Sequence, residues 1–181
     1  MTPTTVDHRD ALVRAAASGD RESFGVLVEG CWNALVRFAR SIVGELEAED
    51  AVQEALLIAW DKLPQLDDPR RFDAWVMQIT FRRSLRRLGR WRRRAEWDVQ
   101  QRHTDHAREG QNTEIEVWSL LRHLAPRQRA VLHLTVVEGM TDSEVATALG
   151  IRPSSVRAHR RRARQHLSAL LSATAASGKG Q

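Results

Sequence analysis

The sequence predicts an all-α protein of two small helical domains joined by a flexible linker. Apolar residues recur every three or four positions over long stretches, whereas the alternation that marks β-strands is nearly absent. Proline and glycine are scarce, at 5 and 10 of 181 residues. One polar segment, residues 95–113, has no sustained apolar stripe and reads as the linker. We therefore expect one domain at residues 1–94, a second at 114–171, and a disordered tail at 172–181.

The charge balance is compatible with a nucleic-acid partner. The formal net charge is +5, and all but two of the 28 basic residues are arginines, the exceptions being Lys62 and Lys179. Arginine's planar guanidinium suits bidentate contacts to phosphate and guanine. Cys31 is the single cysteine, so neither an internal disulfide nor a cysteine-based metal cluster is expected. Its position in an apolar stripe predicts a buried thiol.

Targeting signals and cofactor motifs are not evident in the sequence. The N-terminal twenty residues lack the apolar core of a signal peptide, and no apolar run approaches membrane-spanning length. His103 and His106 lie three residues apart, but no further ligands cluster near them. We expect a soluble, cytoplasmic protein without a metal, a cofactor or membrane insertion.

The first domain is expected to contain three helices before its central loop. They span Asp7–Ala17, Glu22–Val43 and about Glu47–Leu63, with a break at Ser18–Asp20 and Gly44 ending the second helix. The second helix keeps its period throughout, with an apolar stripe of Phe24, Leu27, Val28, Cys31, Leu35, Phe38, Ala39 and Ile42.

The third predicted helix has a second face opposite its core stripe. Asp50, Gln53, Glu54 and Leu57 share this face because they lie three and four residues apart. Acidic residues near a helix start can simply interact with the helix dipole and with water. The exposed Leu57 beside them equally favours a surface that docks a partner.

A loop at Pro64–Arg71 leads into a fourth helix, expected from Phe72 to about Trp91. Its later part is densely basic, with Arg82, Arg83, Arg86, Arg87, Arg90, Arg92, Arg93 and Arg94. Such charges repel one another unless a polyanion neutralises them, which favours nucleic acid over a solvated face. Trp75 precedes this run on nearly the same side, where it could either stack on bases or pack in the core.

The second domain is expected to begin with a helix at about Ile115–Leu124. A further helix follows from Pro126 to about Gly139, with Val131, Leu132, Leu134 and Val137 available for the core. Within TDSEVATALGIRPSSVRAHRRRAR, Thr141–Arg164, Thr141 and Glu144 form a capping box and Gly150 permits a tight turn. Pro153 then starts a basic helix that continues through Leu167, Leu170 and Leu171.

A short helix, a tight turn and a basic helix are the pattern of a helix-turn-helix, whose second helix enters the DNA major groove. The alternative interpretation is an ordinary helical hairpin with a solvated arginine face. The joint occurrence of the capping box, the turn glycine and the basic helix in register favours DNA recognition.

The order of these segments resembles the sigma-70 family of bacterial RNA polymerase initiation factors, and in particular its two-domain extracytoplasmic-function branch. AEDAVQEALLIAW, Ala48–Trp60, resembles the helix that docks on polymerase. RFDAWVMQITFRRSLRRLGRWRRR, Arg71–Arg94, resembles the segment that engages the minus-ten element. Leu124–Leu171 is similar to the domain that reads the minus-thirty-five element.

The resemblance assigns residues to three surfaces. It implies core-polymerase contacts at Glu49, Asp50, Gln53, Glu54 and Leu57. It implies minus-ten contacts at Arg70, Arg71, Trp75, Gln78, Arg82 and Arg86, with the loop Leu66–Arg71 helping to capture a flipped base. It implies minus-thirty-five contacts at Ser154, Ser155, Arg157, Ala158, His159, Arg161 and Arg162. The implied partners are core RNA polymerase, promoter DNA and an anti-sigma factor.

Four arginines depart from the family's pattern. Arg82 replaces a frequent asparagine, Arg83 and Arg160 stand where an aliphatic residue is common, and Arg152 replaces a usual serine or threonine cap. We expect the extra charges to strengthen phosphate binding, at some cost to local packing.

The leading hypothesis is therefore a non-enzymatic promoter-specificity subunit. A one-component transcriptional regulator, with a helical ligand-binding or dimerising domain, is the alternative, and it predicts a dimer on a palindromic site. A nucleic-acid enzyme is a third class, but no phosphate loop, metal-ligand cluster or nucleophile–base pair supports it.

Overall fold

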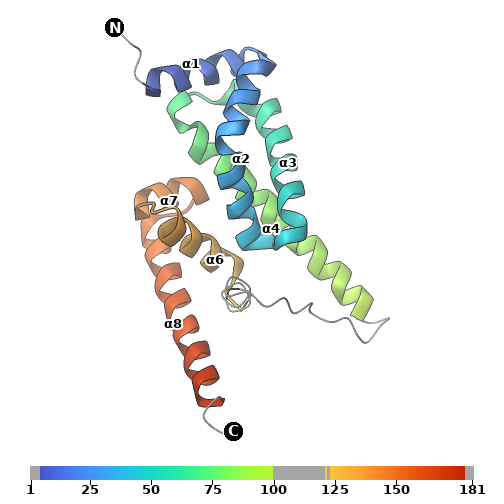
Figure 1. The fold of residues 1–181 in the computed structure, drawn as a ribbon, viewed down its shortest axis with the longest axis vertical. Coiled ribbons are helices and arrows are strands. Elements are labelled where there is room, and N and C mark those ends of the chain that lie inside the picture. The colour runs from blue at the N-terminus through green and yellow to red at the C-terminus, as the bar shows by residue number, and fades with distance from the viewer. Residues whose placement is uncertain (1–4, 100–120, 122, 178–181) are drawn as a thin grey trace. The chain divides into compact units, whose positions relative to one another are not determined.

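The computed structural model describes residues 5–99, 121 and 123–177, and in these residues the chain forms helices and turns without a β-strand. Two compact units are present, with the main division inside helix α4 after Arg87. Figure 1 shows α1, α2, α3 and the first part of α4, which belong to the first unit, and α6 and α8, which belong to the second. The predicted all-α class with two helical domains is confirmed. The expected linker lies outside the described residues from residue 100 onward.

The first unit packs four helices around one core (Figure 1). They are α1 (Thr5–Ala17), α2 (Arg21–Val43), α3 (Glu45–Lys62) and α4 (Phe72–Val99). α2 packs against both α1 and α3. Each helix contributes fully buried apolar side chains, among them Val13, Leu27, Leu35, Phe38, Val52, Phe72 and Val76. Because all four helices share this core, the outward faces of α3 and α4 are held on one body.

Local sequence signals place most of the helix ends. Asp20 caps α2 by accepting a hydrogen bond from the Glu22 amide at 3.1 Å, and Gly44, with φ +88°, separates α2 from α3. The Pro64–Arg71 loop contains two short 3₁₀ turns, η1 (Leu63–Gln65) and η2 (Pro69–Arg71). α4 continues to Val99, past both the expected helix end at Trp91 and the expected domain boundary at Arg94. Between Gly89 and Val99 the sequence contains neither proline nor glycine, so nothing there interrupts the helix.

The second unit contains α6 (Pro126–Leu132), most of α7 (Asp142–Leu149) and α8 (Pro153–Ser177). α6 packs against α8, and the buried apolar residues include Val131, Leu134, Val145, Val156 and Ala163. The expected helix at Ile115–Leu124 lies mostly outside the described residues. Its last residue, Leu124, is buried. The unit therefore supports α7 and α8 as the predicted helix-turn-helix pair.

A π-helical turn, η3 (His133–Val137), follows α6 and changes the register of the expected core stripe. The Glu138 amide donates to the His133 carbonyl five residues earlier, at 3.2 Å, so this turn is wider than an α-helical one. The Thr135 hydroxyl also donates to the Val131 carbonyl at 2.8 Å. Val137 was expected in the core, but it is 61% exposed because the wider turn rotates it outward.

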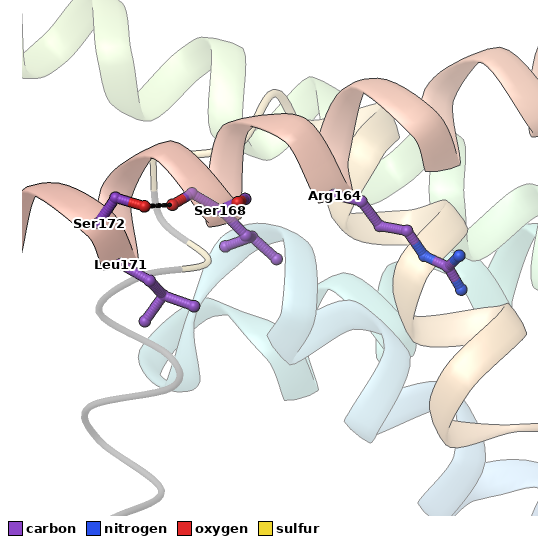
Figure 2. A pocket seen from close by; sticks show the side chains of 5 residues that line it. Arg164, Ser168, Leu171 and Ser172 are labelled. Atoms are coloured by element: carbon purple, nitrogen blue, oxygen red, sulfur yellow. Dashed lines mark hydrogen bonds between the residues drawn. The ribbon is translucent and has the colours of Figure 1, made fainter.

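α8 runs on to Ser177, farther than the sequence predicted, so residues 172–177 are helical rather than a disordered tail. Residues 178–181 lie outside the described part of the chain. Figure 2 shows Arg164, Ser168, Leu171 and Ser172 along a shallow surface of this late segment. Leu171 is exposed, whereas Leu167 and Leu170 are half-buried. None of the described helices is long and apolar enough to span a membrane.

Cys31 provides a chemical test of the first core. The side chain is 7% exposed, and burial, the largest cause, raises the pKa of its thiol from 9.0 to about 11. Because the thiolate is the reacting species, we expect native protein at pH 8 to react with a thiol reagent only after denaturant is added. C31A/V26C is the matched control, since Val26 is exposed on the same helix. If the thiols at positions 31 and 26 react equally fast in the native proteins, Cys31 is not buried in this core.

Candidate partner-docking and nucleic-acid surfaces

A single arginine of α4 joins the acidic side of α3. The Arg87 Nε donates to Glu47 Oε2 at 2.7 Å, and its Nη2 donates to Asp50 Oδ2 at 2.9 Å. A third pair joins Arg87 Nη1 to Glu54 Oε1. Burial lowers the pKa of Arg87, but its bonds to Glu47 and Glu54 outweigh that effect and raise the pKa overall. We call Arg87, Glu47, Asp50 and Glu54 the α3–α4 ion cluster.

The ion cluster changes the interpretation of the arginine run. The Arg87 side chain is only 15% exposed, and it faces carboxylates rather than solvent. Its expected membership in a continuous nucleic-acid-binding face is therefore wrong, because α3 already supplies its counter-charges. Sequence reasoning missed this contact, since Asp50 and Arg87 are 37 positions apart.

The outer face of α3 combines polar and apolar side chains beside the ion cluster. Glu49, Asp50 and Gln53 are exposed there, and Leu57 is 73% exposed. Leu46 was not expected in this surface, yet it is 95% exposed. Leu46, Gln53 and Leu57 lie seven and four residues apart, so they follow one side of the helix. We call Leu46, Glu49, Asp50, Gln53 and Leu57 the α3 outer face.

The predicted minus-ten residues on α4 also follow one side of their helix. Trp75, Gln78, Arg82 and Arg86 are separated by three, four and four residues. Arg82 and Arg86 are exposed, whereas Trp75 and Gln78 are half-buried. Trp75 packs against the core, with its ring centroid 6.3 Å from that of Phe72. Packing against the core therefore explains why the Trp75 side chain is half-buried, and a role for its ring in stacking on bases stays a prediction.

The loop before α4 is ordered by Asp68. Its Oδ1 accepts hydrogen bonds from the Arg70 amide at 3.1 Å and from Arg70 Nε at 3.0 Å. The bond to the Arg70 side chain is the main reason that the pKa of Asp68 lies below its ordinary value. Both Arg70 and Arg71 are exposed. The loop thus presents two guanidiniums beside the first turn of α4.

α1 is tied to the same end of α4. Arg9 Nε donates to Asp73 Oδ2 at 3.1 Å, and the Arg9 guanidinium lies 5.9 Å from the centroid of the Phe72 ring. These contacts combine an ion pair with a cation–π interaction. They fix the start of α4, from which the predicted DNA-contacting side chains extend.

The helix-turn-helix has the local geometry that the sequence predicts. The Thr141 amide donates to Glu144 Oε2 at 2.8 Å, and the Glu144 amide donates to the Thr141 hydroxyl at 3.3 Å. This capping box lowers the pKa of the Glu144 carboxyl, chiefly through the Thr141 amide. Gly150 turns the chain with φ +65°, and Pro153 is the first residue of α8.

The predicted minus-thirty-five residues lie at the start and middle of α8. Ser154, Arg157, Arg161 and Arg162 are exposed, whereas Ser155, Ala158 and His159 are half-buried. Burial, followed by the nearby Arg127 and Arg162, lowers the pKa of His159 from its ordinary value. This shift favours the neutral imidazole, which can both donate and accept a hydrogen bond.

Arg160 forms an ion pair with Asp142 of α7. Its Nη1 donates to Asp142 Oδ1 at 2.5 Å, and its Nη2 donates to Oδ2 at 3.3 Å. Asp142 of α7 thus supplies a counter-charge to Arg160 that the sequence did not predict, and a contribution of Arg160 to phosphate binding stays a prediction. The Arg160–Asp142 pair joins α8 to α7 through charge-assisted hydrogen bonds.

Within the described residues, no group of three or more histidine, cysteine or acidic side chains is arranged to hold a metal ion. The notable side chains on both units are instead charged and apolar groups at helix surfaces. This arrangement suits macromolecular recognition.

Comparison with protein-family models identifies both halves of the chain. Residues 27–95 match Sigma-70 region 2, and residues 114–167 match Sigma-70, region 4. The chain belongs to the sigma-70 family of RNA polymerase sigma factors. The α3 outer face and α4 fall in region 2, whereas the helix-turn-helix falls in region 4. The resemblance inferred from the segment order is thus confirmed.

Curated relatives extend over nearly the whole chain. RNA polymerase sigma factor NccH of Alcaligenes xylosoxydans xylosoxydans is 32% identical, over 94% of this chain and 97% of NccH. ECF RNA polymerase sigma factor SigD of Mycobacterium tuberculosis is 31% identical, over 87% of this chain and 81% of SigD. These relatives support assignment to the extracytoplasmic-function (ECF) branch.

Two solved structures share the fold. CnrH in complex with the cytosolic domain of CnrY superimposes with a TM-score of 0.70 and 35% identity, covering 92% of this chain and 99% of CnrH. RpoE in complex with the anti-sigma factor NepR, from Bartonella quintana, gives a TM-score of 0.66 and 25% identity. That match covers 83% of this chain and 98% of RpoE.

Removing the Arg87 guanidinium should destabilise the first unit. R87A leaves three carboxylates of α3 close together without their shared counter-charge, so we expect unfolding free energy to fall by about 2 kcal/mol. Urea unfolding followed by circular dichroism measures this loss. R86A is the matched control, because Arg86 is the exposed neighbour on the same helix and should change stability by less than about 0.5 kcal/mol. Equal effects of the two substitutions would show that the ion cluster does not stabilise the unit.

Proposed function

We propose that this sigma factor binds core RNA polymerase through the α3 outer face and positions the enzyme at promoters through α4 and α8. The observation that carries the polymerase assignment is the exposure of Leu46 and Leu57 on the same side of α3 as Gln53. Large exposed apolar residues among polar neighbours are typical of protein-binding surfaces. Here they accompany carboxylates that the α3–α4 ion cluster holds in place.

The α4 surface is assigned to the minus-ten element. Arg82 and Arg86 would neutralise phosphates, and Arg70 and Arg71 extend the positive surface into the preceding loop. Trp75 and the loop Leu66–Arg71 would hold a base that has left the duplex. Because such a site accepts only an unpaired base, its binding free energy favours strand separation. No bond is made or broken in this step, and the chain supplies binding rather than catalysis.

The start of α8 is assigned to the minus-thirty-five element. In a helix-turn-helix, the early residues of the second helix reach base edges, which here are Ser154, Ser155, Arg157 and Ala158. His159, Arg161 and Arg162 follow within the next two turns. The arginines can contact phosphate or guanine, and the His159 imidazole can donate a hydrogen bond and, in its neutral form, also accept one. The site of action is the cytoplasm, where bacterial polymerase meets DNA.

A one-component regulator accounts for less of the chain. It would explain α7 and α8, but it gives no reason for the match of residues 27–95 to Sigma-70 region 2. It also predicts a symmetric dimer on a palindrome. We therefore retain the sigma-factor function alone and expect a monomeric factor on an asymmetric promoter.

An anti-sigma factor is a further proposed partner. CnrH was solved with the cytosolic domain of CnrY, and RpoE was solved with the anti-sigma factor NepR. The exposed surfaces that we assign to polymerase and DNA are suited to being covered by such a protein. We propose that this chain is also controlled by reversible masking of those surfaces.

Reconstitution with purified core polymerase tests the proposed function. The wild-type chain should bind core and direct initiation from a genomic promoter library, whereas core alone should not. We expect L57S to weaken core binding at least tenfold, because the contact loses a buried leucine side chain worth about 1.5–3 kcal/mol. Fluorescence titration of labelled factor with core measures this change.

V26S is the matched control, because Val26 is also exposed on the first unit but lies on α2. It should bind core as the wild type does. A wild-type chain that neither binds core nor directs initiation would refute the proposed function. Normal binding by L57S would refute only the assignment of the α3 outer face.

A further inference from the structure

Asp142 places a carboxylate against two arginines of the predicted DNA-reading helix. It accepts both hydrogen bonds from Arg160, and its Oδ2 lies 3.9 Å from Arg157 Nη1. The side chains of Asp142 and Arg160 are 22% and 30% exposed, whereas that of Arg157 is 61% exposed. Arg160 is therefore largely committed to Asp142, while Arg157 stays available to an external ligand.

Capping does not explain why this carboxylate is present. Thr141 and Glu144 already form the capping box at the start of α7. A carboxylate close to DNA also opposes binding, because it repels phosphates and cancels part of the arginine charge. Asp142 also lies in the first turn of α7, where a carboxylate interacts favourably with the helix dipole, and its contacts extend from there to two arginines of α8.

Contact with a carboxylate limits how an arginine can be oriented. A free arginine side chain has many rotamers and can contact phosphates of any sequence. An arginine held by a carboxylate has fewer orientations and can meet a guanine edge in one geometry. Arg157 and Arg160 are three residues apart, so they project from adjacent turns of one side of α8. One carboxylate can consequently anchor Arg160 and restrain Arg157.

We propose that Asp142 is a specificity-determining positioning residue for the upstream promoter element. Through Arg160 it fixes α8 against α7, and it directs Arg157 toward one base pair. Its negative charge also weakens binding to unrelated DNA. This inference rests on the proposed function, in which α8 reads that element.

The test uses holoenzyme assembled from core polymerase and the full chain. Wild-type holoenzyme first selects its preferred sequence from promoter duplexes randomised in the upstream element. Binding of each variant is then measured on the selected duplex and on the unselected random pool, between 50 and about 200 mM salt. The ratio of the two affinities is the specificity ratio.

D142N should lower the specificity ratio about tenfold, since a bidentate contact between an arginine and a guanine discriminates by roughly 5- to 150-fold. Binding to the random pool should be unchanged or tighter, with a log–log salt slope steeper by about one, because one arginine is released to phosphate. E144Q is the matched control: it removes the same formal charge from the same helix turn, and glutamine still serves a capping box. It should keep the wild-type ratio.

The double mutant D142N/R157A distinguishes a role of Asp142 in orienting Arg157 from a role in folding alone. In an R157A background, D142N should lower the specificity ratio by a smaller factor than it does in the wild-type chain, because the arginine it directs is already absent and only the contact with Arg160 and the repulsion of unrelated DNA remain to be lost. Equal ratios for D142N and E144Q would overturn the proposal. So would equal weakening of both probes by D142N, which marks a purely structural role, or a full additional loss in the R157A background.

R160M provides a second route if D142N does not fold. It removes the guanidinium but keeps an apolar stem, and it should also lower the specificity ratio because α8 loses its anchor on α7. An unchanged ratio for R160M would overturn the anchoring role. If wild-type holoenzyme initiates transcription but selects no upstream sequence, this proposal fails alone. If it does not initiate, the proposed function fails with it.

Discussion

The ion cluster around Arg87 is the interaction on which the organisation of the first unit depends. α3 carries carboxylates and α4 carries arginines, and one guanidinium bonds to three carboxylates across the two helices. A guanidinium that donates hydrogen bonds to neighbouring carboxylates has fewer N–H groups left to bind DNA phosphates. The cluster therefore lies between the α3 outer face, which we propose for polymerase, and the exposed arginines of α4, which we propose for nucleic acid.

The same division of arginines recurs in the second unit and at the start of α4. Arg160 is held by Asp142, and Arg9 is held by Asp73, whereas Arg82, Arg157 and Arg161 remain exposed. The high arginine content thus serves two purposes. Some guanidiniums join helices internally, and others are exposed on the surfaces that we propose for DNA binding. For a sigma factor this matters, because sequence-independent attraction by every arginine would favour unrelated DNA over promoters.

The sequence predicted those features whose causes are local. The capping box of Thr141 and Glu144, the turn at Gly150 and the burial of Cys31 each follow from residue type and spacing, and each is confirmed. The helix-turn-helix and its order after the acidic helix also sufficed to suggest the family. The fold class was predictable for the same reason, since helical periodicity is repeated along the chain.

Features that depend on distant partners were not predictable in this way. Asp50 and Arg87 are 37 positions apart, and Asp142 and Arg160 are 18 apart, so spacing gave no reason to pair them. Val137 left the core because the chain forms a π turn, which periodicity at 3.6 residues does not anticipate. Leu46 could have been found, because it lies on the same side of the helix as Gln53 and Leu57. Its position in the first turn of the helix concealed that relation.

Site-specific photo-cross-linking within a promoter-bound holoenzyme tests the central claim most directly. A photoreactive amino acid placed at position 57, on the α3 outer face, should cross-link to a polymerase subunit and not to DNA. The same group at position 161 of α8 should cross-link to the upstream promoter duplex. Cross-links from position 57 to DNA alone, or from position 161 to polymerase alone, would contradict the division of the molecule into a polymerase-binding face and a DNA-reading helix.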